Sequence, residues 1–124
     1  MIKKKILIVD DEPDIAETIR FKLESEGYHC SVSNNGYDAV EKVHKDMPDL
    51  IILDVRLPKK NGYQVCRLLK FDEEYKHIPI FMLTARTQPS DKMLGKYAGA
   101  NAYITKPFKM EILLKYVNGY LQKA

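Results

Sequence analysis

Short runs of consecutive apolar residues alternate along the chain with longer segments in which apolar residues recur every three or four positions. A continuous run such as KILIV is typical of a strand buried on both faces, and the longer spacing is typical of a helix with one apolar face. The pattern predicts five strands, at residues 5–9, 29–33, 49–54, 79–84 and 101–105. It predicts five helices, one between Asp11 and Gly27 and the others at residues 37–46, 62–71, 89–98 and 109–121.

Strands and helices that alternate in this way predict βαβ units and a parallel sheet. Right-handed crossovers then place helices on both faces, which gives a doubly wound α/β fold in one domain spanning residues 1–124. The strand at 29–33 is more polar than the others, so we expect it at an edge of the sheet. Asp11 is expected to cap the first helix. The inner face of the third helix is expected to consist of Val65, Leu68 and Leu69.

The composition is that of a globular domain, since 45% of the 124 residues are hydrophobic and 30% are charged. No apolar run approaches the roughly 20 residues that a membrane span needs. The run ILIV that follows the start MIKKK is shorter than the apolar region of a signal peptide. We therefore expect a soluble, cytoplasmic protein. Cys30 and Cys66 lie far apart in apolar segments and are expected to be reduced packing residues.

The net charge of +3 is unevenly distributed. Residues 1–54 hold 7 Lys and Arg against 12 Asp and Glu, a balance of −5, whereas residues 86–124 hold 7 against 2, a balance of +5. The small total argues against a general nucleic-acid binder. The asymmetry suggests an acidic cation site in one half with basic side chains of the other half turned toward it.

Candidate chemistry stands just past the strands, where a doubly wound sheet binds its ligands. Asp10 and Asp11 follow the first strand, Asp54 ends the third, Thr84 ends the fourth and Lys106 follows the fifth. Clustered carboxylates repel one another unless a cation lies among them, and oxygen donors without a His or Cys cluster suit Mg²⁺ or Mn²⁺. A divalent ion beside a lysine and a hydroxyl can stabilise a phosphoryl group in transfer.

The phosphoryl donor is expected to be a small molecule or a protein, because the chain has neither a Walker A motif nor GxGxxG. A carboxylate can accept the group covalently as a nucleophile.

Four segments in order, ILIVDDEPD, LIILDVRLPKKNGY, FMLTART and AGANAYITKPF, resemble the response-regulator receiver domains of bacterial two-component signalling. The resemblance covers essentially the whole chain. It implies the flavodoxin-like receiver fold, with five parallel strands in the order 2-1-3-4-5. It also implies a phosphorylatable switch that catalyses only its own phosphorylation and dephosphorylation and is not an enzyme on external substrates.

The resemblance assigns a role to each strand-end residue. Asp54 is implied to be the phosphoacceptor. Asp11 and Asp54 are implied to bind Mg²⁺ (or Mn²⁺) directly, together with the backbone carbonyl of Arg56, and Asp10 to act through a water. Lys106 is implied to pair with the phosphoryl oxygens.

Three further positions follow from the same resemblance. Thr84 is implied to donate its hydroxyl to the phosphoryl group, and Tyr103 to be the switch aromatic that turns inward once Thr84 has moved. The bond between Lys106 and Pro107 is implied to be a cis peptide, since only X–Pro bonds adopt cis at low cost.

The implied partner is a sensor histidine kinase or a histidine phosphotransfer protein, with an unknown downstream effector. We expect no direct nucleic-acid or membrane binding and a monomer or weak dimer. The segment GANAY has Asn101 and Ala102 where family members that dimerise through this region usually carry two aspartates, which puts those salt bridges in doubt. Arg56 and Arg86 flank the expected site and are hypothesised to shield the acyl phosphate from water.

Three alternatives remain open. An aspartyl-phosphate hydrolase would place its nucleophile first in a DxD motif after the first strand, where this chain has DD, and normally carries a cap insertion. A flavodoxin-like flavin binder would need a phosphate loop in place of DDEPD, whose charges repel phosphate. A degenerate receiver would act as a phosphorylation-independent binding module, although every chemical position is present.

Overall fold

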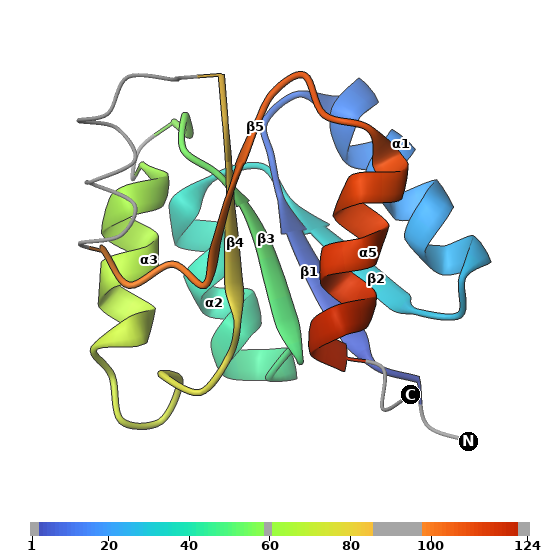
Figure 1. Ribbon diagram of the computed structural model, residues 1–124. Helices are drawn as coiled ribbons and strands as arrows, with labels where there is room; N and C mark the ends of the chain where they lie inside the picture. Colours follow the sequence, from blue (N-terminus) through green and yellow to red (C-terminus); the bar gives the residue numbers. More distant parts are fainter. Residues whose placement is uncertain (1–2, 59–60, 86–97, 122–124) are drawn as a thin grey trace.

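The computed structural model describes residues 3–58, 61–85 and 98–121. Five parallel strands form one sheet in the order β2-β1-β3-β4-β5, which confirms the predicted α/β fold (Figure 1). The strands are β1 (Lys5–Val9), β2 (His29–Ser33), β3 (Leu50–Asp54), β4 (Ile80–Thr84) and β5 (Ala102–Thr105). The helices within the described ranges are α1 (Pro13–Ser25), α2 (Gly36–Asp46), α3 (Gly62–Lys70) and α5 (Met110–Leu121). The helix predicted at 89–98 lies outside these ranges except for Ala98.

The sheet separates two hydrophobic clusters because successive side chains of a strand point to opposite faces. Ile6 and Ile8 of β1 belong to the cluster under α1 and α5, whereas Leu7 and Val9 belong to the cluster under α2 and α3. The middle strands β3 and β4 are buried along their whole length. This arrangement explains why those two strands read as unbroken apolar runs in the sequence.

Most predicted boundaries of the strands and of α2, α3 and α5 coincide with the observed ones and the others differ by one residue, and β2 is an edge strand as expected. Two finer predictions were wrong. Leu68 is 48% exposed, and Cys66 takes the expected inner position beside Val65 and Leu69. The N-cap residue of α1 is Glu12 and not Asp11, and its side chain makes no capping hydrogen bond.

Both cysteines are buried and free, as expected. Burial raises the pKa of the Cys30 and Cys66 thiols to about 12, which keeps them protonated at neutral pH.

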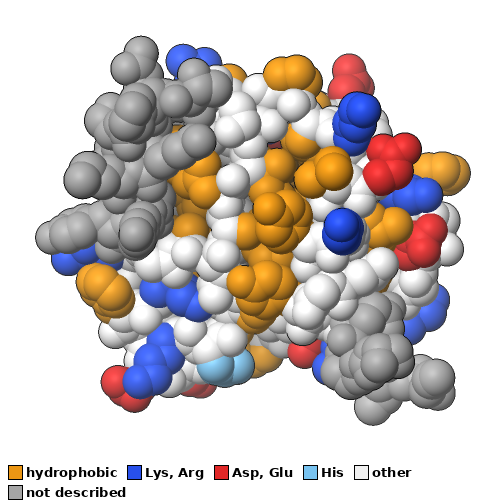
Figure 2. Space-filling model, viewed as in Figure 1, with side chains coloured by type: hydrophobic (Ala, Val, Ile, Leu, Met, Phe, Trp, Pro, Cys, Tyr) orange, Lys and Arg blue, Asp and Glu red, His pale blue; other side chains and the backbone are white. Residues whose placement is uncertain are grey.

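A band of hydrophobic side chains lies in the middle of the face that carries β5 and α5 (Figure 2). Ile112, Tyr116 and Tyr120 of α5 are each exposed by more than two fifths, and the two tyrosine rings meet buried Phe81 edge-on. None of the helices in the described ranges has the length and apolar character of a membrane span.

Candidate functional site

The polar residues predicted at the strand ends come together at the carboxyl edge of the sheet. The parallel register pairs Val9 with Leu53, so Asp10, which follows β1, lies beside Asp54 at the end of β3. On the other side of β3, Thr84 at the end of β4 is paired with Thr105, the last residue of β5. Lys106 comes directly after Thr105 and therefore lies at the same edge of the sheet. Parallel topology therefore brings the residues that end or follow β1, β3, β4 and β5 to one edge of the sheet.

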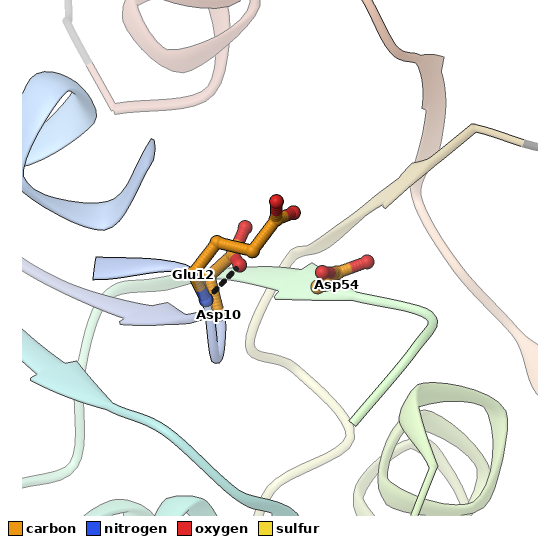
Figure 3. Close-up of side chains that lie close together, drawn as sticks. All are labelled: Asp10, Glu12 and Asp54. Carbon is orange, nitrogen blue, oxygen red and sulfur yellow. Dashed lines mark hydrogen bonds between the residues drawn. The ribbon is translucent and has the colours of Figure 1, made fainter. Parts of the chain in front are cut away.

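Three carboxylates crowd this edge: Asp10, Glu12 and Asp54 (Figure 3). Each offers an oxygen, and these oxygens lie within 4.8 Å of one another. Asp10 and Asp54 are only 2% and 4% exposed. The Lys106 Nζ reaches all three groups, at 3.2 Å from Asp54 Oδ2, 3.3 Å from Asp10 Oδ2 and 3.4 Å from Glu12 Oε1.

Backbone hydrogen bonds orient the two buried carboxylates. Asp10 Oδ1 accepts the N–H of Glu12 at 2.9 Å, which Figure 3 draws as a dashed line. Asp54 Oδ1 accepts the N–H of Arg56 at 3.2 Å. Because each Oδ1 is held by the loop that follows its own strand, each Oδ2 is left to face Lys106.

The site carries more negative charge than one lysine offsets. Burial raises the pKa of Asp54 to about 6, and repulsion from Asp10 raises it further. The positive charge of Lys106 and the hydrogen bond from the Arg56 N–H act in the opposite direction and lower this pKa. Burial lowers the pKa of Lys106, but attraction to Asp54 and Asp10 outweighs it and the pKa is raised. Three carboxylates against one ammonium leave a deficit of positive charge, and carboxylate oxygens are the donors that Mg²⁺ and Mn²⁺ prefer. The residues present therefore fit such an ion.

Gly62 brings the start of α3 against the end of β3. The Gly62 N–H donates to the Val55 carbonyl at 2.9 Å. A methyl group added at Gly62 would overlap the backbone carbonyl oxygen of Asp54 and lie 2.8 Å from the Cα of Val55. Asn61, just before Gly62, and Gln64, two residues after it, form a capping box, so the helix begins at a fixed place beside the candidate nucleophile.

Thr84 and Tyr103, the predicted switch residues, lie on neighbouring strands. Thr84 is buried at the end of β4, and its carbonyl accepts the Lys106 N–H at 2.6 Å. Tyr103 is half-buried and packs against the cluster under α2 and α3. Its hydroxyl lies 3.1 Å from the hydroxyl of Tyr63 in the first turn of α3, a contact that the sequence did not reveal.

The structure brings Asp10, Asp54 and Lys106 together as predicted but does not include Asp11 in the carboxylate cluster of the described residues. Asp11 is exposed and lines a pocket of about 410 Å³, together with Arg56 and the loop that follows β3. The third carboxylate is Glu12, which the sequence analysis missed. The segment DDEPD contains this acid, but its spacing does not show that the Glu12 side chain lies over the strand end. Arg86 lies outside the described residues.

Two other predictions concern the segment around β5. The Lys106–Pro107 peptide bond is cis, as predicted. Asn101 has a structural role, because its Oδ1 accepts hydrogen bonds from the Ile80 N–H at 2.9 Å and from Lys70 Nζ at 3.0 Å. This amide ties the start of β4 to the end of α3.

Comparison with known proteins agrees with this geometry. A family model described as the response regulator receiver domain matches residues 6–118. The chain is 36% identical to a candidate response regulator from Chloroflexus aurantiacus, with a TM-score of 0.92 over 98% of this chain and 100% of that one. It is 35% identical to the chemotaxis protein CheY4 of Vibrio cholerae, with a TM-score of 0.90 over 97% and 100%. It is 36% identical to the receiver domain of a signal transduction histidine kinase from Syntrophus aciditrophicus, with a TM-score of 0.90 over 98% and 94%.

Proposed function

Because the chain belongs to the response-regulator receiver family, we propose that it is a phosphoacceptor switch in which Asp54 takes a phosphoryl group from a phosphohistidine. The observation that best supports this proposal is the setting of Asp54: a buried carboxylate at the end of a rigid strand, with Lys106 Nζ 3.2 Å away. A carboxylate buried only for packing would be neutralised by its partners, whereas this one shares its single cation with two other acids.

In the proposed reaction, an oxygen of the Asp54 carboxylate attacks the phosphorus atom. A P–O bond forms while the P–N bond to the donor histidine breaks, and the electron pair of that bond stays on the imidazole nitrogen, which takes up a proton. Lys106 keeps Asp54 in the carboxylate form and then donates hydrogen bonds to the phosphoryl oxygens. The Arg56 N–H fixes one oxygen of Asp54 and so limits the directions of attack.

Asp54 directly and Asp10 through a water are proposed to hold Mg²⁺ (or Mn²⁺), which when bound neutralises charge on the phosphoryl oxygens. Asp11 and the backbone carbonyl of Arg56 remain proposed ligands. Their support is that both residues line one pocket next to the end of β3.

The proposed switch passes from Thr84 to Tyr103. Phosphorylation adds a charge at Asp54 that a rearranged Thr84 hydroxyl accommodates, and Tyr103 then changes its packing. Tyr103 lines a pocket together with Ile112 and Tyr116 of α5, on the face that carries the hydrophobic band (Figure 2). A change at Tyr103 would therefore alter the surface that an effector contacts. The hydroxyl contact with Tyr63 gives the unphosphorylated position a specific partner.

The proposed setting is the cytoplasm, with a sensor histidine kinase or a histidine phosphotransfer protein as phosphoryl donor. The protein is proposed to bind neither nucleic acid nor membrane by itself, to be a monomer or weak dimer, and to catalyse only its own phosphorylation and dephosphorylation.

Intact mass after incubation with acetyl phosphate tests the proposal. We expect a Mg²⁺-dependent gain of one phosphoryl mass in the parent and in Asp14→Asn, whose carboxylate lies in the first turn of α1, and no gain in Asp54→Asn. If the parent gains no mass from acetyl phosphate or from a phosphohistidine donor, the hypothesis of a phosphorylation-independent binding module replaces that of a phosphoacceptor switch.

A further inference from the structure

The Glu12 side chain belongs to the carboxylate cluster of the site, although Glu12 stands at the start of a helix. It is the N-cap residue of α1, yet its side chain makes no capping hydrogen bond. Instead the side chain folds back over the strand end toward Asp10 and Asp54 (Figure 3). Its Oε1 lies 3.4 Å from Lys106 Nζ. The carboxylate is therefore used in the site and not in the helix.

Glu12 differs from the two aspartates in exposure and in support. Its side chain is 61% exposed, against 1% for Asp10 and 5% for Asp54. Backbone N–H groups hold both aspartates, whereas within the described part of the chain the Glu12 carboxylate is held by the Lys106 ammonium. Glu12 is thus the member of the cluster that can leave at the lowest cost.

The Lys106 ammonium donates hydrogen bonds to three carboxylates at once. Its distances of 3.2, 3.3 and 3.4 Å all exceed the roughly 2.7–2.9 Å of a strong charge-assisted hydrogen bond. A phosphoryl group on Asp54 would add three oxygens and further negative charge beside this ammonium. Lys106 can bind those oxygens fully only by giving up one of its present partners.

We propose that Glu12 competes with the phosphoryl group for Lys106 and thereby limits how strongly the site holds that group. This inference rests on the proposed function of Asp54. Two effects act in the same direction. The ion pair of Glu12 with Lys106 favours the unphosphorylated site, and the Glu12 carboxylate repels the phosphoryl anion directly. Glu12 is therefore a regulatory residue that acts through Lys106, and its removal should strengthen phosphoryl binding.

Beryllofluoride, which binds an aspartate carboxylate as a phosphoryl analogue, is the probe. It is titrated at saturating Mg²⁺ into the parent, Glu12→Gln and Glu17→Gln, and bound and free amide resonances are integrated. Glu17→Gln is the matched control, because it removes the same charge from an exposed residue of α1 whose ion pair is with Arg20. We expect Glu12→Gln to bind about two- to fivefold more tightly than the parent and the control, the range set by one exposed ion pair. The difference should shrink at high ionic strength.

Glu12→Asp separates contact from charge. It keeps the carboxylate but shortens the side chain by one methylene, so it should no longer reach Lys106 and should bind the probe more like Glu12→Gln than like the parent. Glu12→Asp that binds like the parent would overturn the competition, and so would Glu12→Gln that binds no more tightly than Glu17→Gln. A parent that binds no beryllofluoride and gains no phosphoryl mass contradicts the proposed function as well, so the two failures are distinguishable.

Discussion

The strand β3 carries an aspartate at each end, and the two meet opposite conditions. Asp49, just before the strand, accepts the Lys5 N–H at 2.7 Å through Oδ2 and donates its own N–H to the Lys5 carbonyl at 2.8 Å. Asp54, at the other end, is buried, lies beside Asp10 and shares Lys106 with two other carboxylates. Asp49 is a satisfied structural acid near solvent. Asp54 is held where its charge is poorly compensated, which is the arrangement expected of a nucleophile awaiting a cationic or phosphoryl ligand.

The largest expected effect comes from the support under Asp54. Gly62→Ala should lower the free energy of unfolding by about 3 kcal/mol, because the added methyl group overlaps the Asp54 carbonyl oxygen and the surrounding backbone cannot yield. Chemical denaturation measures the change. Gly119→Ala in α5 is the control, since nothing lies within 4 Å of a methyl group there, and it should be neutral or stabilising by up to about 1 kcal/mol. Equal stabilities for the two variants would show that β3 and α3 do not depend on their close approach.

A smaller effect of opposite sign should follow from removing the charge of Asp54. The folded state holds the Asp54 proton more tightly than the unfolded chain, because the pKa rises from 3.8 to about 6. The parent therefore loses stability as the pH rises from about 4 to about 6, and above that range the whole penalty is present. In EDTA, Asp54→Asn should be more stable than the parent by about 2 to 3 kcal/mol at pH 7 and equal to it near pH 4.

Thermal or chemical denaturation of both proteins across this pH range supplies the test. A difference that stays constant with pH would contradict the electrostatic origin of the effect, because a packing change does not titrate.

Asp49→Asn should give the smallest change in the free energy of unfolding, and it should destabilise the protein whereas Asp54→Asn stabilises it. The substitution replaces a charged acceptor of the Lys5 N–H by a neutral one near solvent, so we expect a loss of about 0.5 to 1 kcal/mol at pH 7. Measured beside Asp54→Asn under the same conditions, it sharpens the contrast between the two ends of β3. A gain in stability at Asp49 would mean that acidic strand ends in this fold are unfavourable in general and that Asp54 is not exceptional.

The residues of the site that follow strands directly could be predicted from the sequence, and the others could not. Asp10, Asp54, Thr84 and Lys106 stand at the ends of apolar runs, and parallel topology brings such positions to one edge. Glu12 escaped prediction because its place depends on how the turn before Pro13 bends, which no periodicity encodes.

The sequence also did not predict which apolar side chains face the sheet where several stand close together in one helix. In α3, Val65, Cys66, Leu68 and Leu69 are all apolar, and the sequence does not say whether Cys66 or Leu68 faces the sheet. The contact between Tyr63 and Tyr103 joins elements 40 residues apart and depends on the packing of α3 against the end of β5. Both outcomes follow from tertiary packing and not from local pattern.

Locating the phosphoryl group tests the central claim most directly. After incubation with acetyl phosphate and Mg²⁺, borohydride reduces an aspartyl phosphate to homoserine, and tryptic peptides report its position. We predict homoserine at Asp54, in the peptide of residues 46–56, with Asp49 of the same peptide unchanged. Homoserine at Asp10 or Asp11, in the peptide of residues 6–20, would contradict the assignment and place the nucleophile after β1.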